Sequence, residues 1–236
     1  MKIALIGYGK MGREIGAVAI EQGHTIDQIF EIDRHVDAAS LAGIDVCIEF
    51  STPQTVLQNI EVALEARKDI VVGTTGWYDQ LPKIRDRVRD SALIYSANFS
   101  LGVNLYFRMI ARAAELMRNA GEYDPYIHEI HHRQKIDSPS GTALKLADIL
   151  VSRIDRKKRI VTEKCDGQID PAALHVSSTR VGTFAGTHTV GFDSEADLIE
   201  ITHVARSRRG FALGAVRAAG WIHGKKGVFT MDDVEL

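Results

Sequence analysis

The sequence of 236 residues has few cysteines, almost no net charge and no long hydrophobic run. Its two cysteines, Cys47 and Cys165, are too few for a disulfide framework and lack the spacing of metal ligands. The formal net charge of −2 argues against binding to nucleic acid or to a membrane surface. No stretch is long enough to span a membrane, and the N-terminus lacks a secretory hydrophobic region. We therefore expect a cytoplasmic protein without a resident metal ion.

The first half of the sequence alternates short apolar runs with amphipathic segments. Strands are predicted at Lys2–Ile6, Thr25–Phe30, Ile44–Phe50, Ile70–Val72 and Leu93–Tyr95. Helices are predicted between them at Met11–Gln22, Pro53–Ala66 and Tyr78–Val88, whereas Asp37–Gly43 is too short for a full helix. This alternation is typical of parallel strands joined by crossover helices, and it indicates a Rossmann-type sheet.

The second half of the sequence changes character after Asn98. Helices are predicted at Val103–Met117 and Ser140–Ile154, strands at Tyr126–His131, Leu174–Thr179, Thr187–Phe192 and Leu198–His203, and an exposed loop or helix end at Asp155–Lys164. A final helix, Phe211–Trp221, and the run Gly227–Thr230 would return to the first sheet. We thus predict an α/β protein with a dinucleotide-binding domain at residues 1–100 and 211–236. Residues 101–210 would form an α+β substrate-binding, catalytic and oligomerisation domain with a mixed sheet.

A phosphate-binding turn is predicted directly after the first strand. The run Gly7-Tyr8-Gly9-Lys10-Met11-Gly12 matches G-x-G-x-x-G between a strand and a helix, which is the context of dinucleotide binding. The first glycine permits the tight turn, the second lets the backbone approach a pyrophosphate, and the third lets the helix pack close to the strand. The alternative is a turn that is rich in glycine by chance.

Further candidate contacts for a dinucleotide follow the later strands. Glu31 lies 19 residues after Gly12, where an acid accepts hydrogen bonds from ribose hydroxyls. Its charge repels a 2′-phosphate and favours NADH, although Arg34 can offset this repulsion. Two turns at the carboxyl ends of strands, Gly73-Thr74-Thr75-Gly76 and Ser96-Ala97-Asn98-Phe99, can border a nicotinamide ring. Each of these features also fits a plain role, as a solvated acid or a simple turn.

The densest chemistry lies at His128–Ala143, where His, Arg and Lys side chains precede a predicted helix start. Ser138 or Ser140 can cap that helix, and Pro139 suits its first turn. The amides of Ser140, Gly141 and Thr142 would then form a site for a carboxylate or a phosphate. A zinc ion shared by His131 and His132 is disfavoured because neighbouring residues on a strand face opposite ways. The remaining alternatives are a solvated basic loop and an anionic-substrate pocket that contains a proton donor.

The segment His131–Ala143 resembles the signature of the dihydrodipicolinate reductases of bacterial lysine and diaminopimelate synthesis. The resemblance covers nearly the whole chain and includes Gly7–Gly12, Gly73–Gly76, Asn98–Asn104 and Glu200–His203. It implies reduction by NADH or NADPH of a cyclic dicarboxylate with conjugated C=C and C=N bonds to tetrahydrodipicolinate. It also implies a homotetramer.

The resemblance further implies roles for individual residues. His131 matches the proton donor and acceptor, Lys135 a second proton donor, and His132 a substrate contact. Gly141 and Thr142, next to Ser140, match the residues that bind a carboxylate. The dinucleotide contacts match Gly7–Gly12, Glu31, Gly73–Thr75 and Ser96–Phe99. An Arg that follows the ribose acid in some members is Ile32 here, which leaves Arg34 as the candidate for a 2′-phosphate.

The positive charges at this site can stabilise an anionic substrate during its reduction. Hydride transfer adds negative charge to a ligand that already carries two carboxylates, and we expect cationic His131 and Lys135 to stabilise that charge. Two other functions share the glycine-rich turn: another two-domain NAD(P)-dependent dehydrogenase, and a non-catalytic redox sensor that binds NADH. The segment from His131 to Thr142 favours the reductase, because a sensor needs neither proton donors nor an anion-binding helix start.

Overall fold

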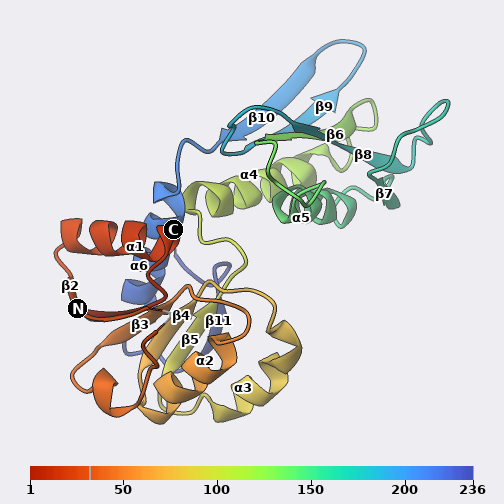
Figure 1. The fold of residues 1–236 in the computed structure, drawn as a ribbon. Coiled ribbons are helices and arrows are strands. Elements are labelled where there is room, and N and C mark those ends of the chain that lie inside the picture. Colours follow the sequence, from red (N-terminus) through yellow and green to blue (C-terminus); the bar gives the residue numbers. More distant parts are fainter. Residues whose placement is uncertain (32, 236) are drawn as a thin grey trace. The chain divides into compact units, whose positions relative to one another are not determined.

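The computed structural model describes residues 1–31 and 33–235, and the chain divides into two compact units. Unit 1 comprises residues 1–104 and the C-terminal segment that starts at Arg208, and unit 2 comprises Leu105–Ser207. Each unit has one β-sheet (Figure 1). Among the described residues, no helix combines the length and the apolar character needed to cross a bilayer.

Unit 1 contains a six-stranded sheet in which all strands are parallel, as predicted. Its strands are β1 (Lys2–Ile6), β2 (Thr25–Phe30), β3 (Val46–Glu49), β4 (Asp69–Val72), β5 (Ala92–Tyr95) and β11 (Gly227–Thr230). Their order across the sheet is β11-β5-β4-β3-β1-β2. The predicted return of the last strand is confirmed, because β11 pairs in parallel with β5.

Helices cover both faces of this sheet. Helices α1 (Lys10–Glu21) and α6 (Arg209–Ile222) pack on one face, and α2 (Val56–Glu65) and α3 (Leu81–Arg87) pack on the other (Figure 1). Strand β1 serves both cores, because Ile3 and Leu5 point to the first and Ala4 and Ile6 to the second. Such double burial accounts for the unbroken apolar run in the sequence.

The short connections of unit 1 contain two 3₁₀ turns, η1 (Ala39–Leu41) and η2 (Tyr78–Gln80). The first agrees with the expectation that Asp37–Gly43 is too short for a full helix. The second divides the segment Tyr78–Val88, which we predicted as one helix. Pro82 explains the division, because it lacks the N–H that would continue the helical hydrogen-bonding pattern.

Unit 2 contains a mixed five-stranded sheet in the order β10-β9-β6-β8-β7, as predicted. The elements are α4 (Leu101–Met117), which starts in unit 1, then β6 (Asp124–His131), α5 (Gly141–Val151), β7 (Arg159–Val161), β8 (Ala173–Arg180), β9 (Thr187–Asp193) and β10 (Leu198–Val204). The central strand β6 runs antiparallel to β9 and parallel to β8. Its side chains alternate between buried and half-buried positions, so one face of β6 packs in the interior.

The charged segment Asp155–Lys164 was expected to be an exposed loop or helix end, and this prediction was wrong in part. It contains the edge strand β7, and Lys157 is only 2% exposed. The Lys157 Nζ donates hydrogen bonds to the carbonyls of Pro171, at 2.9 Å, and Ala173, at 2.7 Å, and pairs with Asp124. A lysine can be buried when its ammonium is fully paired in this way, and composition alone does not reveal such pairing.

Candidate active site

The glycine-rich turn of unit 1 has the geometry that its spacing predicts. Gly7 has a φ of +91°, and a Cβ there would lie 2.3 Å from the carbonyl oxygen of Phe50. A Cβ at Gly12 would lie 2.1 Å from the carbonyl oxygen of Gly7, so helix α1 can approach β1 only with glycine at this position. Gly9 has no heavy atom within 4 Å of such a Cβ. The space beside Gly9 is therefore open to a ligand.

A cavity of about 380 Å³ adjoins this turn. The predicted contacts Gly7, Tyr8, Gly9, Glu31 and Arg34 line it, together with side chains from the β3–α2 connection, among them Ser51 and Asn59. Gly9 is the N-cap of α1, and Lys10 and Met11 form its first turn, so unpaired amides of a helix N-terminus face the same region. An open glycine, helix amides and an exposed acid at one cavity fit a dinucleotide.

The predicted contacts Glu31 and Arg34, which follow β2, differ in their surroundings. Glu31 is exposed at the cavity. Arg34 donates hydrogen bonds to the carbonyl of Ile29, at 3.1 Å, and to Gln28 Oε1, at 2.8 Å, and stacks over the Phe30 ring at 4.6 Å. Its guanidinium is thus held against β2, at the rim of the cavity. Ile32, which we compared with the family arginine, lies outside the described residues.

Glu49 is a buried acid behind the cavity that our sequence interpretation missed. It ends β3 and is 0% exposed, and its Oε1 accepts hydrogen bonds from the Ser51 amide at 3.1 Å and from Asn59 Nδ2 at 3.3 Å. Burial raises the pKa of Glu49, although the hydrogen bonds from Ser51 oppose this shift. Glu49 therefore orders two residues of the cavity wall, Ser51 and Asn59.

The two predicted turns at the carboxyl ends of β4 and β5 differ in exposure. In the first, Gly73 abuts the Phe50 ring, Thr74 is buried and its carbonyl accepts from Trp77 Nε1, and Thr75 is exposed. In the second, Ser96 Oγ donates to the carbonyl of Asn98, Ala97 is exposed, and Phe99 is 2% exposed with its ring 5.8 Å from that of Phe50. The Phe99 side chain belongs to the core, so a dinucleotide can meet only its backbone.

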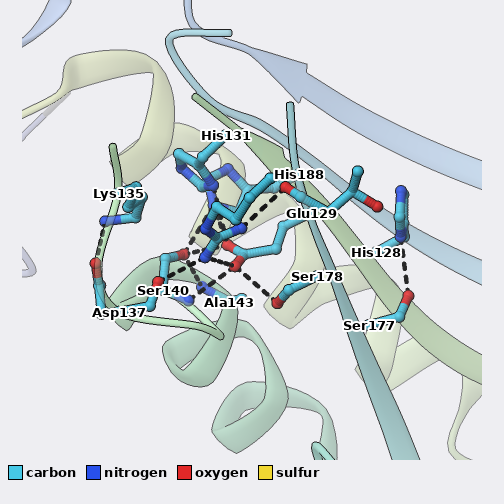
Figure 2. A network of polar contacts seen from close by, with 12 residues as sticks. His128, Glu129, His131, Lys135, Asp137, Ser140, Ala143, Ser177, Ser178 and His188 are labelled. Atoms are coloured by element: carbon cyan, nitrogen blue, oxygen red, sulfur yellow. Dashed lines mark hydrogen bonds and ion pairs between the residues drawn. The ribbon is translucent and has the colours of Figure 1, made fainter. Parts of the chain in front are cut away.

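In unit 2, strand register brings the chemistry of the predicted catalytic segment together. Glu129 and His131 lie two residues apart on β6, so their side chains share one face. Directly opposite Glu129 lie His188 on β9 and Ser178 on β8, and opposite His131 lies Arg180 on β8. The central strand thus gathers groups from both neighbouring strands around Glu129, as Figure 2 shows.

Glu129 is the centre of this polar cluster and is 0% exposed. Its Oε1 accepts hydrogen bonds from the Ser140 amide at 2.9 Å, Ser178 Oγ at 2.9 Å and Arg180 at 2.8 Å. Its Oε2 accepts from the Ser140 hydroxyl and lies 3.3 Å from His188 Nε2 and 3.4 Å from His131 Nδ1 (Figure 2). Burial by itself would raise the pKa of Glu129, but the hydrogen bonds from His188, Ser140 and Arg180 outweigh it and lower the pKa. Glu129 is therefore an anion throughout the neutral range.

His131 is buried, and its surroundings set its charge in the ligand-free protein. It is 6% exposed, and its ring lies 4.9 Å from that of His188 in an edge-on arrangement. Burial lowers the pKa of His131 to about 4, against the opposing charge of Glu129 and with further lowering from His188, Lys135 and Arg180. The imidazole is thus neutral at pH 7 without a ligand, and the cationic His131 that we expect during hydride transfer stays a prediction. Buried surroundings of this kind cannot be inferred from the order of residues.

The loop between β6 and α5 carries the remaining predicted residues. Lys135 is partly exposed, and its Nζ pairs with Asp137 Oδ1 at 2.7 Å. His132 is half-buried, and its amide donates to the carbonyl of Phe184 at 2.9 Å. Arg180 fastens the loop to the cluster because it donates to the carbonyl of Asp137 at 2.6 Å as well as to Glu129.

The predicted anion-binding helix start is present with Ser140 as its N-cap. The Ser140 hydroxyl accepts from the amide of Ala143 at 3.2 Å, and Gly141 and Thr142 form the first turn of α5. Of the two serines that we considered, Ser140 is thus the cap. Pro139, expected in the first turn, instead precedes the cap. Burial by itself would raise the pKa of the Asp137 carboxyl, but hydrogen bonds from Lys135 and from the backbone of Gly141 lower it, so a carboxylate already lies at the exposed start of α5. An entering anion would take the place of the Asp137 side chain.

Three residues of the cluster also have the donor types of a metal site. Ligand atoms of Glu129, His131 and His188 lie within 4.8 Å of one another. However, both Glu129 oxygens already accept hydrogen bonds, and the Arg180 guanidinium lies 2.8 Å from one of them. A cation bound here would displace Ser140 and meet the positive charge of Arg180. We therefore interpret these residues as a hydrogen-bonded cluster.

Four members of this cluster, Glu129, Ser178, Arg180 and His188, were missed by the sequence interpretation. One signal for Glu129 is present in the sequence, since its spacing of two from His131 places both on one face of a strand. The other three lie 49 to 59 residues after Glu129, and only the pairing of β6 with β8 and β9 brings them close.

Comparison with known proteins identifies relatives over the whole length of the chain. The family models described as "Dihydrodipicolinate reductase, N-terminus" and "Dihydrodipicolinate reductase, C-terminus" match residues 1–99 and 102–234. The 4-hydroxy-tetrahydrodipicolinate reductase of Christiangramia forsetii is 42% identical over 238 residues, which cover 99% of this chain and 97% of the relative. The enzyme of the same name from Archaeoglobus fulgidus is 39% identical over 258 residues, 99% of each chain.

Solved structures agree on the fold. The dipicolinate-bound dihydrodipicolinate reductase from Paenisporosarcina sp. TG-14 has a TM-score of 0.77 at 21% identity, with 99% of this chain and 100% of that chain covered. An amine dehydrogenase from Mycobacterium smegmatis has a TM-score of 0.59 at 11% identity and covers 100% of this chain and 96% of its own. From the family models and the relatives, together with this fold, we conclude that the chain belongs to the dihydrodipicolinate reductase family.

Proposed function

We propose that this protein is a 4-hydroxy-tetrahydrodipicolinate reductase that uses NADH or NADPH. The observation that carries this proposal is the joining of His131, Lys135 and the N-terminus of α5 on one short segment of unit 2. A site that binds a dicarboxylate must have a positive electrostatic potential and leave room for the ligand. The amides of a helix N-terminus beside a lysine meet both requirements. The membership of a family whose relatives carry this name supports the same conclusion.

Unit 1 holds the dinucleotide in this proposal. The amides of Gly9 to Gly12 bind the pyrophosphate, and Glu31 accepts hydrogen bonds from the ribose. The turns at Gly73–Thr75 and Ser96–Phe99 border the nicotinamide. The bound dinucleotide supplies the hydride. Because Glu31 repels a 2′-phosphate while Arg34 is held against β2, we propose turnover with both dinucleotides and a preference for NADH.

Unit 2 holds the substrate and delivers the proton. The amides of Gly141 and Thr142 and the side chain of His132 bind the carboxylates. Loss of the 4-hydroxyl group as water leaves a ring with conjugated C=C and C=N bonds. Negative charge grows on this ring as hydride adds to it, and the ammonium of Lys135 stabilises this charge. His131 is neutral in the ligand-free protein, so we propose that the incoming carboxylates raise its pKa and let it take up the proton that it later transfers. One positioned acid commonly contributes about 10²–10⁴ in rate.

We also propose that the protein is a cytoplasmic homotetramer. Apolar side chains exposed on the edge strand β10 support self-association: Leu198 is 49% exposed, Ile199 40% and Val204 57%. Light scattering coupled to gel filtration tests the tetramer, for which a monomeric mass would contradict the proposal.

A coupled assay tests the function. A synthase generates 4-hydroxy-tetrahydrodipicolinate in the cuvette, and absorbance follows the oxidation of NADH and, separately, of NADPH. We expect turnover with both and a higher kcat/KM for NADH. Turnover of amino acids or semialdehydes in its place would point to another dehydrogenase, and tight NADH binding without turnover of any of them would point to a sensor.

A further inference from the structure

The role of Glu129 is not explained by contact with a substrate. Its side chain is 0% exposed and lies beneath His131 and Ser140 (Figure 2). A group with no accessible surface cannot bind a ligand or exchange a proton with one directly. Whatever Glu129 does for the reaction, it does through its neighbours.

Those neighbours are the two parts of the substrate site that must stay aligned. One oxygen of Glu129 lies 3.4 Å from His131 Nδ1 and also accepts from the Ser140 hydroxyl. The other accepts from the Ser140 amide, which directly precedes the first turn of α5. Among the described residues His131 Nδ1 has no hydrogen-bond partner, so this 3.4 Å approach becomes an ion pair when the imidazole takes up a proton. A single carboxylate thus fixes the proposed carboxylate-binding helix start through hydrogen bonds and faces the proposed proton donor on β6.

The surrounding contacts keep this carboxylate in one place. Ser178 and Arg180 approach it from β8, and His188 approaches it from β9. Arg180 also donates to the carbonyl of Asp137, whose side chain pairs with Lys135. The cluster thus reaches every group for which we propose a role in proton transfer.

We propose that Glu129 is a positioning residue of the reductase site, which holds the N-terminus of α5 by hydrogen bonds and orients the His131 ring by pairing with its protonated form. The inference rests on the proposed function and deepens it. It needs a carboxylate rather than an amide, because both oxygens act as acceptors. In Glu129→Gln the side-chain NH₂ would replace one of these two acceptors. It would face hydrogen-bond donors, so the cluster would have to rearrange.

A double-mutant cycle in kcat tests whether Glu129 acts through His131. We expect Glu129→Gln to lower kcat by about 10²-fold in the parent protein, the cost of a misplacement of about 1 Å. In the His131→Asn background the same change should lower kcat only a few-fold, because no proton donor is left to position. Equal losses in the two backgrounds would overturn the proposal.

The affinity for pyridine-2,6-dicarboxylate tests whether Glu129 also acts at the start of α5. Glu129 also holds Ser140, so Glu129→Gln should weaken this probe about tenfold whether or not His131 is present. The affinity for NADH should not change, since the predicted dinucleotide contacts lie in unit 1. Unchanged affinity for the probe, or a parallel loss of NADH affinity, would argue against a role for Glu129 at α5.

Two variants guard against a loss of fold. Ser177→Ala, on the neighbouring strand β8, removes a hydroxyl that lies 2.9 Å from His128 Nδ1 and should leave kcat unchanged. Glu129→Asp keeps the charge but shortens the side chain by one methylene group. It should lower kcat less than Glu129→Gln does, and this decrease should also disappear in the His131→Asn background. Circular dichroism melting shows which variants are folded. Should Glu129→Gln be unfolded, the cycle with Glu129→Asp decides.

The imidazole resonances of His131 supply a measurement that does not need turnover. The charged or titratable groups that face this ring are Glu129, His188, Lys135 and Arg180, and of these only Glu129 raises its pKa. Glu129→Gln should therefore move the midpoint of His131 to lower pH. A midpoint that stays in place would overturn the proposal. Absence of turnover in the parent protein, by contrast, would contradict the proposed function. The shift in the His131 midpoint would still show whether Glu129 acts on His131.

Discussion

Binding of a dicarboxylate to unit 2 should be accompanied by uptake of a proton at His131. Burial lowers the pKa of His131 to about 4 in the ligand-free protein. At pH 7 only about one molecule in 10³ then carries the imidazolium, and charging the remainder costs about 4 kcal/mol. An anion about 4 Å away, at an effective dielectric constant of about 20, returns a similar energy. The ligand should therefore raise the pKa by about three units, to near 7.

The sign of the pH dependence follows from this shift. Between the two pKa values the complex binds one proton more than the free protein, so affinity rises as the pH falls from about 7 toward 4. The change approaches tenfold per pH unit. Calorimetry at pH 6 with pyridine-2,6-dicarboxylate, in two buffers of different ionisation enthalpy, should give an uptake of nearly one proton. Imidazole resonances should show midpoints near 4 without the ligand and near 7 with it.

His131→Asn is the matched control, because asparagine keeps polarity without a titratable ring. Proton uptake should disappear in this variant, while Glu129 remains ionised because its pKa is low. The reasoning would be refuted by an ordinary His131 midpoint near 6.5 in the ligand-free protein. Proton uptake that persists undiminished in the variant would refute it as well, since another group would then be the acceptor.

Three further predictions concern single residues. Gly9→Ala should keep a nearly unchanged melting temperature but bind NADH at least tenfold more weakly, because no heavy atom lies within 4 Å of its Cβ in the ligand-free protein. Gly12→Ala should lower the melting temperature, because its Cβ would lie 2.1 Å from the Gly7 carbonyl oxygen. The reverse order of effects would mean that the turn is not a pyrophosphate site. Lys135→Ala should lower kcat by about 10²-fold or more and leave the NADH Kd nearly unchanged, and a large loss of NADH affinity would contradict its proposed place at the substrate. Glu31→Gln should reduce the ratio of kcat/KM for NADH over NADPH, because it removes the charge that repels a 2′-phosphate, and an unaltered ratio would show that Glu31 does not contact the ribose.

Much of unit 1 could be predicted because local sequence rules act there. The strands Lys2–Ile6 and Thr25–Phe30 coincide with β1 and β2, and the apolar run of β1 reflects burial on both faces. Gly12 is fixed by a contact with Gly7 in the same turn, whereas Gly7 itself lies against Phe50 after β3, a contact that depends on the pairing of β1 with β3. Local rules failed at Lys157, where burial depends on carbonyls 14 and 16 residues away.

The parallel sheet, the turn that ends at Gly12 and the segment with His131, Lys135 and the start of α5 could all be predicted from residue order. Each depends on periodicity or on spacing within one or two elements, which a linear pattern records. The charge state of His131 and the place of Glu129 at the centre of the site could not be predicted in this way. Both depend on the register of β6 between β8 and β9, which brings Ser178, Arg180 and His188 to a single buried carboxylate. The cost of burying a charge depends on all neighbours at once, and their positions are fixed only when the strands pair.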